Sequence, residues 1–167
     1  MADTFKWDAL KRTDYYADNQ HLYTFCGVLS QRGLFVNVAK EMVKAGHPDR
    51  ALEMLDKCVE CVPECNYPLD ISYLGYSNEL MVLDMVNLYY ILGQREKASD
   101  LASRFTDKML QSLNFYMDFY SFAKEDFDRA RQYLYMVQDI ADDNKDTALS
   151  EKVTAGFKAL QEKLGAE

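Results

Sequence analysis

The residues from Phe35 to Pro63 read FVNVAKEMVKAGHPDRALEMLDKCVECVP, and their spacing decides the fold class. Apolar side chains recur at helical spacing on both sides of Gly46, where the period is interrupted. Two amphipathic helices joined by so short a turn pack antiparallel. Small side chains at Ala39 and Ala51 let the two backbones approach closely. The stretch therefore predicts a helical hairpin.

A second copy of this pattern begins 47 residues further along, at Val82. The first turn, KAGHPDRALEM, has its counterpart in ILGQREKASDL, which carries Gly93 and Ala98 at the matching positions. This order of apolar, small and turn residues resembles the tetratricopeptide repeat. The spacing exceeds the usual repeat of about 34 residues. We therefore expect a long connection over residues 64–76.

We predict one all-α domain over residues 1–167, a tetratricopeptide-like α-α superhelix of stacked helical hairpins with a C-terminal capping helix. Its expected parts are an irregular N-terminal segment (1–18), a first repeat region (19–63), a second repeat (77–111), a degenerate third repeat (115–142) and a capping helix (147–164). Residues 19–45 form either one long helix or two helices divided at Gly33. Trp7 and the pair Tyr15-Tyr16 are expected to anchor the first segment.

The segment from Ser77 to Leu92 is apolar on nearly all sides, so we expect it to be the most buried helix. Asp84 interrupts it and must find a partner or reach solvent. Further along, we expect a break at residues 112–114 before a short aromatic helix. Aromatic side chains at helical spacing, here residues 115–122, are more typical of a core than of a ligand platform.

The composition limits the partners. The formal charge is −8, from 19 basic and 27 acidic side chains, which argues against nucleic acid or an anionic membrane. The N-terminal residues lack the apolar region of a secretory signal, and the most apolar window is too short to span a bilayer. We therefore expect the chain as given to be soluble, with no direct membrane insertion.

A wider resemblance rests on FKW at residues 5–7, YADN at 16–19 and then the stretch 35–63, in that order. They resemble the C-terminal soluble region of a bacterial family of multi-span membrane proteins, similar to protein O-mannosyltransferase-type glycosyltransferases. The resemblance is clearest over residues 5–63 and weaker to about residue 125. It implies an accessory domain attached to a bacterial membrane, on the periplasmic or the cytoplasmic side. The membrane spans and transferase residues are absent here, so no catalytic residue is carried over.

Stacked helix pairs leave a concave surface lined by the first helix of each pair. On the helical phase of the two repeats, Lys40, Lys44, Asn87 and Tyr90 face that side. Such side chains can receive a peptide carboxylate or backbone, so we expect a protein or peptide partner there. The alternative is an ordinary solvated face.

The connection after the first hairpin is the second candidate region. Tyr67, Tyr73 and Tyr76 are expected to pack an ordered loop, and loops of this length are often functional. The alternative is a connector whose tyrosines only cover the hairpin.

Three cysteines, Cys58, Cys61 and Cys65, form C-x2-C-x3-C, which could bind a metal or act in redox chemistry. No local histidine pair completes the set, and Cys58 and Val59 occupy core positions of a helix, so buried packing is the preferred interpretation.

An enzyme using Glu79, Asp84 and the loop tyrosines is the other alternative. Nucleophile–base pairs and phosphate loops are missing from the sequence. The leading hypothesis is a non-enzymatic interaction module without a cofactor, which binds a protein, a peptide or the membrane portion of a parent protein.

Overall fold

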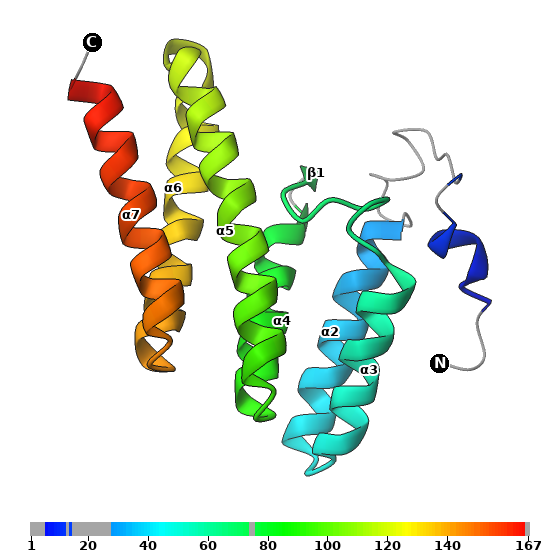
Figure 1. Ribbon diagram of the computed structural model, residues 1–167. Helices are drawn as coiled ribbons and strands as arrows, with labels where there is room; N and C mark the ends of the chain where they lie inside the picture. The colour runs from blue at the N-terminus through cyan, green and yellow to red at the C-terminus, as the bar shows by residue number, and fades with distance from the viewer. Residues whose placement is uncertain (1–5, 13, 15–27, 74–75, 166–167) are drawn as a thin grey trace. The chain divides into compact units, whose positions relative to one another are not determined.

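The structure, a computed structural model, describes residues 6–12, 14, 28–73 and 76–165 (Figure 1). The expected anchors Tyr15 and Tyr16 and the expected helix start at residue 19 lie outside the described residues. Helices make up most of the described chain, so the all-α prediction is confirmed. The chain forms two compact units, Met1–Gly93 and Gln94–Glu167.

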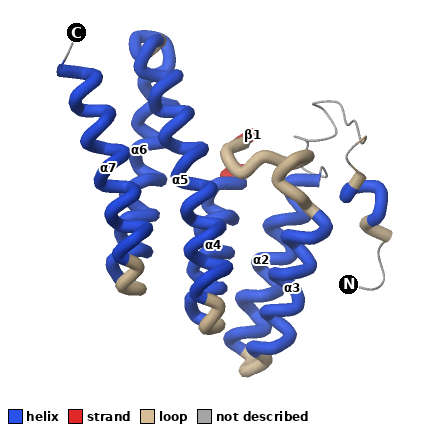
Figure 2. Tube along the Cα trace, in the orientation of Figure 1, coloured by secondary structure: helices blue, strands red, loops and turns tan. Residues whose placement is uncertain are grey.

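The first unit contains the 3-10 helix η1 (Asp8–Lys11) and the α-helices α2 (Val28–Lys44), α3 (Pro48–Cys61) and α4 (Asn78–Ile91). Helices α2 and α3 form the predicted antiparallel hairpin (Figure 2). Ala39 and Ala51 are fully buried, as close helix packing requires. The described part of α2 continues through Gly33 without a break.

The turn between α2 and α3 depends on Gly46. Its φ of 77° lies in the left-handed region, which glycine adopts without steric cost. The N–H of Gly46 donates to the carbonyl of Val43, and the N–H of His47 donates to that of Met42. These bonds satisfy carbonyls at the end of α2, which ends at Lys44, one residue before the predicted end.

Helices α2 and α4 lie side by side and run in the same direction. Arg32 near the start of α2 bonds to Asn78 at the start of α4, and Lys40 further along α2 contacts Asp84 further along α4. The described residues at η1 pack on the α2–α3 hairpin as well. The buried ring of Trp7 lies 5.2 Å from that of Phe35, centroid to centroid, so the predicted anchor at Trp7 is confirmed.

The connection between α3 and α4 ends in a short antiparallel hairpin, β1 (Ser72–Tyr73) and β2 (Tyr76–Ser77). Ser77 also caps α4, since its hydroxyl accepts from the N–H of Leu80 at 3.3 Å. The cap explains why α4 starts directly after the hairpin.

The second unit is a bundle of α5 (Arg95–Asp118), α6 (Tyr120–Asp143) and α7 (Thr147–Gly165). The predicted break at residues 112–114 is wrong, because α5 continues through it to Asp118. Leu113 is fully buried there, and Asn114 donates to the carbonyl of Leu110 at 2.9 Å, so both residues suit a helix. The chain instead turns at Phe119, and α6 is kinked at Ala123.

The capping helix predicted over 147–164 corresponds to α7. It runs parallel to α5: Lys152 bonds to Ser103, and further along Lys163 contacts Asp118. The predicted third repeat, 115–142, contains the end of α5 and most of α6.

The turn between α6 and α7 repeats the geometry of the first turn. Lys145 has a φ of 54°, and the N–H of Asp146 donates to the carbonyl of Ala141, as His47 does to Met42. Asp146 is buried, and its side chain accepts from the N–H of Leu149 at the start of α7. Residues 144–146 therefore form an ordered turn between α6 and α7.

Candidate functional site

Helix α4 is buried on most of its surface, but one stripe is exposed. The stripe consists of Leu80, Asp84, Asn87 and Ile91, which recur at the spacing of one helix face. Leu80 is 39% exposed and Ile91 is 67% exposed. The expectation of a mostly buried helix holds for its other sides, where six apolar side chains are buried: Val82, Leu83, Met85, Val86, Leu88 and Tyr89.

Lys40 from α2 contacts the centre of this stripe. Its Nζ lies 2.5 Å from Oδ2 of Asp84, and both side chains are about one-third exposed, 35% and 31% respectively. Asp84 was expected to find a partner or to reach solvent, and its partner is Lys40. The ammonium group of Lys40 thus joins α2 to α4, and the ligand-binding role predicted for Lys40 stays a prediction.

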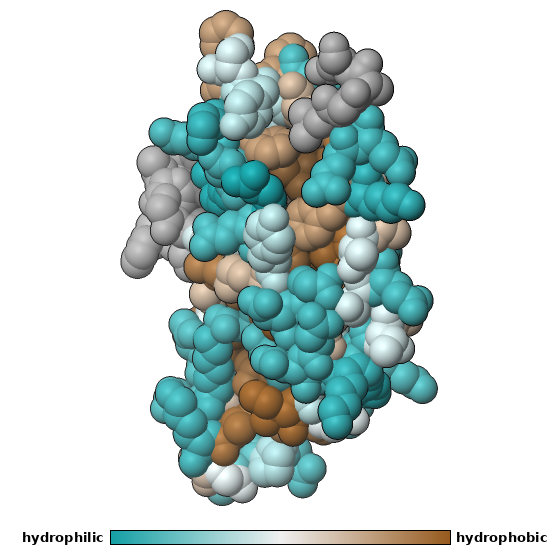
Figure 3. All heavy atoms as spheres, turned by 90° about the vertical axis from the view of Figure 1, so that its left-hand side faces the viewer, coloured by the Kyte–Doolittle hydropathy of each residue, from teal (hydrophilic) through white to brown (hydrophobic). Residues whose placement is uncertain are grey.

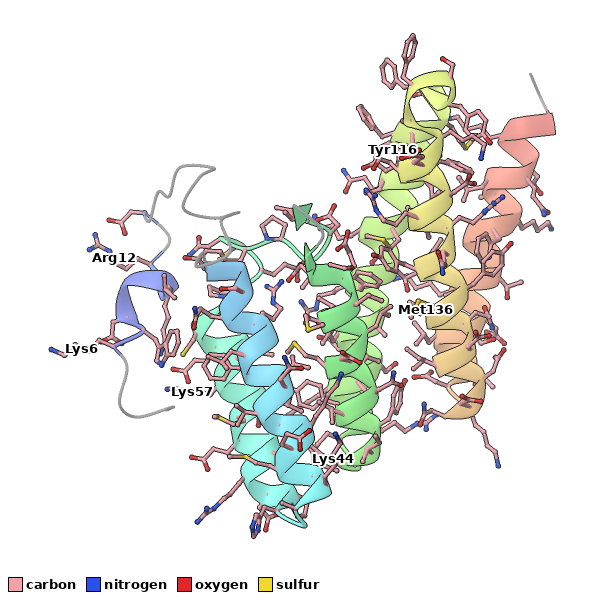
Figure 4. The ribbon with its side chains drawn as sticks, turned by 180° about the vertical axis from the view of Figure 1, so that it is seen from behind. Lys6, Arg12, Lys44, Lys57, Tyr116 and Met136 are labelled. Carbon is pink, nitrogen blue, oxygen red and sulfur yellow. The ribbon has the colours of Figure 1, made fainter. Side chains whose placement is uncertain are left out.

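Lys44 follows Lys40 by one turn of α2 and is directed to solvent near the end of that helix (Figure 4). Its Nζ lies 2.7 Å from Glu41, but 70% of its side chain is exposed. An exposed pair of this kind contributes little stability, so Lys44 can exchange Glu41 for another carboxylate.

Asn87 follows Asp84 by one turn and lies on the same stripe of α4. Among the described residues, its side chain has no hydrogen-bond partner, and it is half-buried. Tyr90 is also half-buried but lies about 60° around the helix from Asn87. The structure thus brings Lys40, Lys44 and Asn87 to one face and places Tyr90 at its edge.

Leu80 and Ile91 were not singled out by the sequence analysis. A helix that is apolar on all sides gives no periodic signal for its exposed side. The positions of Asp84 and Asn87 could have indicated the exposed side, because polar residues in an otherwise apolar helix mark its solvent-facing stripe. Extending that stripe by one turn in each direction reaches both residues.

Arg32 forms a second site that the sequence analysis missed. It is only 2% exposed, and its guanidinium donates to Oδ1 of Asn78 at 2.5 Å and to the carbonyl of Tyr67 at 2.9 Å. The Asn78 amide in turn donates to the carbonyl of Leu69 at 3.0 Å. These bonds tie the connection after α3 to both α2 and α4, so Arg32 has a structural role.

The predicted loop tyrosines differ in position. Tyr67 is fully buried in the connection, whereas Tyr73 and Tyr76 are paired residues of β1 and β2. The burial of Tyr67 agrees with the alternative in which the tyrosines cover the hairpin.

Cys58 and Cys61 are buried in α3, whereas Cys65 is exposed in the following connection. Burial raises the pKa of Cys58 to about 12 and also raises the pKa of Cys61. Cys58 therefore packs as a small apolar residue, as predicted. Val59 was also expected in the core, but it is 43% exposed. Among the described residues, no three His, Cys, Asp or Glu side chains gather as metal ligands.

The carboxylates of the alternative enzyme site have structural surroundings. Glu79 is buried in the first turn of α4, where the hydroxyl of Ser77 lies 3.3 Å from its Oε2. An acidic side chain is favourable at this end of a helix. Asp84, five residues further along, is paired with Lys40.

A shallow concavity of about 390 Å³ lies on α2 and the following turn. It is lined by Asn37, Val38, Glu41, Met42, Ala45 and His47. By helical phase these residues face away from Arg32 and Lys40, and hence away from α4. The concavity is therefore separate from the stripe on α4.

The aromatic residues around the turn between α5 and α6 are exposed, contrary to the expectation of a core. The exposed fractions are 60% for Phe115, 51% for Phe119, 45% for Tyr120 and 93% for Phe122. We call these four residues the aromatic tip; rings gather at this end of the helices, beside the labelled Tyr116 (Figure 4). The chain reverses direction at Phe119, so these side chains extend beyond the bundle core.

Comparison with protein-family models, with curated proteins and with solved structures finds no match to this chain. Within the described residues, no helix combines the length and the apolar character needed to cross a bilayer.

Proposed function

We propose that the chain is a non-enzymatic interaction module that binds a peptide segment of a partner protein along α2 and α4. The binding surface, called the α2–α4 face, consists of Lys40, Lys44, Leu80, Asn87 and Ile91. The observation that carries the proposal is the exposure of two large apolar side chains, Leu80 and Ile91, on either side of a polar centre. Exposed apolar groups bordered by polar ones are typical of binding surfaces.

Each part of the α2–α4 face suits a different part of a peptide. Leu80 and Ile91 are about 16 Å apart along the helix axis, which is the length of a short extended segment. They would contact apolar side chains of the ligand. The Asn87 amide can both donate to and accept from a peptide backbone, and Lys44 can bind a carboxylate. The expected ligand therefore has two apolar side chains and an acidic group near one of them.

We infer that this face belongs to a tetratricopeptide-like superhelix. Support comes from the parallel course of α2 and α4, which are the first helices of successive predicted pairs. The shared turn geometry at Gly46, Gly93 and Lys145, each with positive φ, gives further support. Repeats of this type bind partners along their first helices.

Selection from a phage-displayed peptide library tests the function, with the complete chain as bait. Dissociation constants of the selected peptides are then measured by fluorescence anisotropy for wild type, Asn87→Ala and Ile91→Glu. We expect each substitution to weaken binding at least about tenfold, as loss of a central interface contact does. Lys40→Glu is unsuitable as a test, because it would place a second carboxylate beside Asp84.

Val59→Glu is the matched control, because Val59 is an exposed apolar residue on α3, outside the α2–α4 face. The proposal requires that this variant bind the selected peptides like the wild type. It is wrong if the library yields no specific peptide, or if all variants bind the selected peptides equally.

We further propose that the chain is the accessory domain of a membrane glycosyltransferase-like protein, as its residue order from 5 to 63 suggests. In that case the partner is the membrane portion of the parent protein or a protein that acts with it. The test is the genomic sequence: the reading frame, or an adjacent gene, should encode membrane spans. A reading frame without spans, in a locus without such a gene, would contradict this relation.

A further inference from the structure

The aromatic tip is an apolar surface apart from the α2–α4 face, and it belongs entirely to the second unit. Phe115 and Phe119 come from the end of α5 and the turn, while Tyr120 and Phe122 come from the start of α6. Figure 3 shows hydrophobic side chains at the upper end of the view, where this turn lies. Aromatic rings at the end of a helical hairpin are available to a partner without any rearrangement of the bundle.

Three of the four rings of the tip are held in place by one another or by the bundle. The centroids of Phe115 and Phe119 are 5.2 Å apart, and that of Tyr120 lies 5.3 Å from the buried ring of Phe127. Phe122 has the largest exposure, 93%, and so contributes the most accessible surface. A surface that is ordered before binding loses little conformational entropy when a partner covers it.

The basic side chains around the tip are paired with carboxylates of the same unit. Lys124 pairs with Asp128 at 2.5 Å, Arg129 pairs with Asp126, and Lys163 of α7 lies 3.4 Å from Asp118. The basic side chains at this end are thus occupied by local carboxylates. An anionic ligand, such as a nucleic acid or an acidic membrane, would have to displace those carboxylates and approach a chain of charge −8.

The area of the tip is sufficient for a weak two-fold contact. An aromatic side chain carries about 200 Å² of surface, so the exposed fractions of the four residues leave about 500 Å² on each copy. Two copies in contact would bury about 1,000 Å² from these side chains alone, which is near the lower limit for a specific interface. The surrounding paired charges would extend the contact.

We propose that a second copy of this chain covers the aromatic tip, so that two tips meet in a symmetric dimer. In a two-fold interface the same surface must be complementary to itself. An apolar centre bordered by basic side chains that are already paired meets this requirement, because aromatic rings pack edge to face on one another. The proposal is independent of the peptide-binding function of the α2–α4 face.

Sedimentation velocity of the complete chain, over about 5 to 500 µM at moderate salt, tests the proposal. The variants are Phe122→Glu in the tip and Ile91→Glu, an equally drastic change of an exposed apolar residue on α4. We expect wild type and Ile91→Glu to dimerise with similar dissociation constants. Phe122→Glu should dimerise at least tenfold more weakly, and its circular dichroism should match the wild type because Phe122 is 93% exposed.

Flotation with phosphatidylcholine vesicles separates self-association from insertion of the tip into a membrane. A wild-type chain that remains monomeric at every concentration overturns the proposal, whether or not it binds vesicles. A dimer that Phe122→Glu does not weaken also overturns it, since the contact must then use another surface. Loss of the dimer in Phe122→Glu alone, without vesicle binding by the wild type, supports it.

Discussion

Replacement of Arg32 gives the sharpest test of how the first unit is held together. Its guanidinium is almost completely buried and donates at 2.5 Å to Asn78 and at 2.9 Å to the carbonyl of Tyr67. Longer contacts, of 3.4 and 3.5 Å, reach the carbonyls of Pro68 and Val62. Arg32→Ala removes the donor of these four contacts and leaves their acceptor oxygens without that donor.

The expected cost follows from the two short bonds. A hydrogen bond to a charged group contributes about 1.5–3 kcal/mol, and loss of one member of a buried charged network costs about 3–5 kcal/mol. The Asn78 amide still holds the carbonyl of Leu69, so part of the connection stays tied to α4. We therefore expect Arg32→Ala to lower the free energy of unfolding by about 3 kcal/mol, a large part of the stability of a typical domain.

Urea unfolding followed by tryptophan fluorescence measures this effect in the first unit specifically. Trp7 is the single tryptophan of the chain and packs on Phe35 of α2. Arg50→Ala is the control, because Arg50 is exposed on α3, and a change of less than about 0.5 kcal/mol is expected there. Hydrogen exchange should accelerate at the amides of the connection in Arg32→Ala.

Arg32→Met distinguishes hydrogen bonding from mere filling of space. Methionine retains most of the volume but cannot donate, so the carbonyls near Arg32 stay unsatisfied and the variant should remain destabilised by at least about 1 kcal/mol. Desolvation of a buried charge can outweigh its bonds in some proteins. An Arg32→Met variant as stable as the wild type would show that desolvation of the guanidinium outweighs its hydrogen bonds in this protein. That result would refute the reasoning.

Three further outcomes can be measured. Lys145→Gly should stabilise the chain by about 0.5–1 kcal/mol, because the φ of 54° at this position favours glycine. Lys145→Ala should give no such gain, and the urea midpoints of the two variants measure the difference. In the native protein, iodoacetamide should modify exposed Cys65 much faster than buried Cys58, as peptide mass spectrometry will report; equal rates would contradict the burial. Burial raises the folded-state pKa of both Cys58 and Tyr89, so the unfolded chain loses these protons first and the free energy of unfolding should fall above about pH 9. Urea midpoints between pH 8 and pH 10.5 would check this, and Tyr89→Phe should reduce the fall.

The predictable parts of the fold are those set by neighbouring residues along the chain. The α2–α3 hairpin follows from the apolar spacing and from Gly46. The turn requires a positive φ, and the sequence places a glycine at that position. The capping helix α7 follows in the same way from its narrow apolar face. The predicted break before the aromatic residues failed, because Asn114 bonds within α5 where a turn was expected.

The candidate site was predictable only in part. Lys44 and Asn87 were found because helical phase places them on one side of their helices. The same reasoning placed Lys40 on that side, but helical phase could not reveal that Asp84 of α4 lies 2.5 Å from its ammonium group. Leu80 and Ile91 were missed because an apolar side chain is exposed or buried according to what packs on it, which the helix itself does not specify.

By itself, the sequence determined the α2–α3 hairpin and α7, because periodicity and glycine turns act between residues a few positions apart. The tertiary structure alone decided which helices are neighbours, and with it the partners of Arg32 and Lys40. It also decided that Phe122 faces solvent, since the burial of an aromatic residue depends on whether a distant segment covers it. Local patterns cannot encode those distant contacts, so the exposed surfaces on which function depends emerged only from the folded chain.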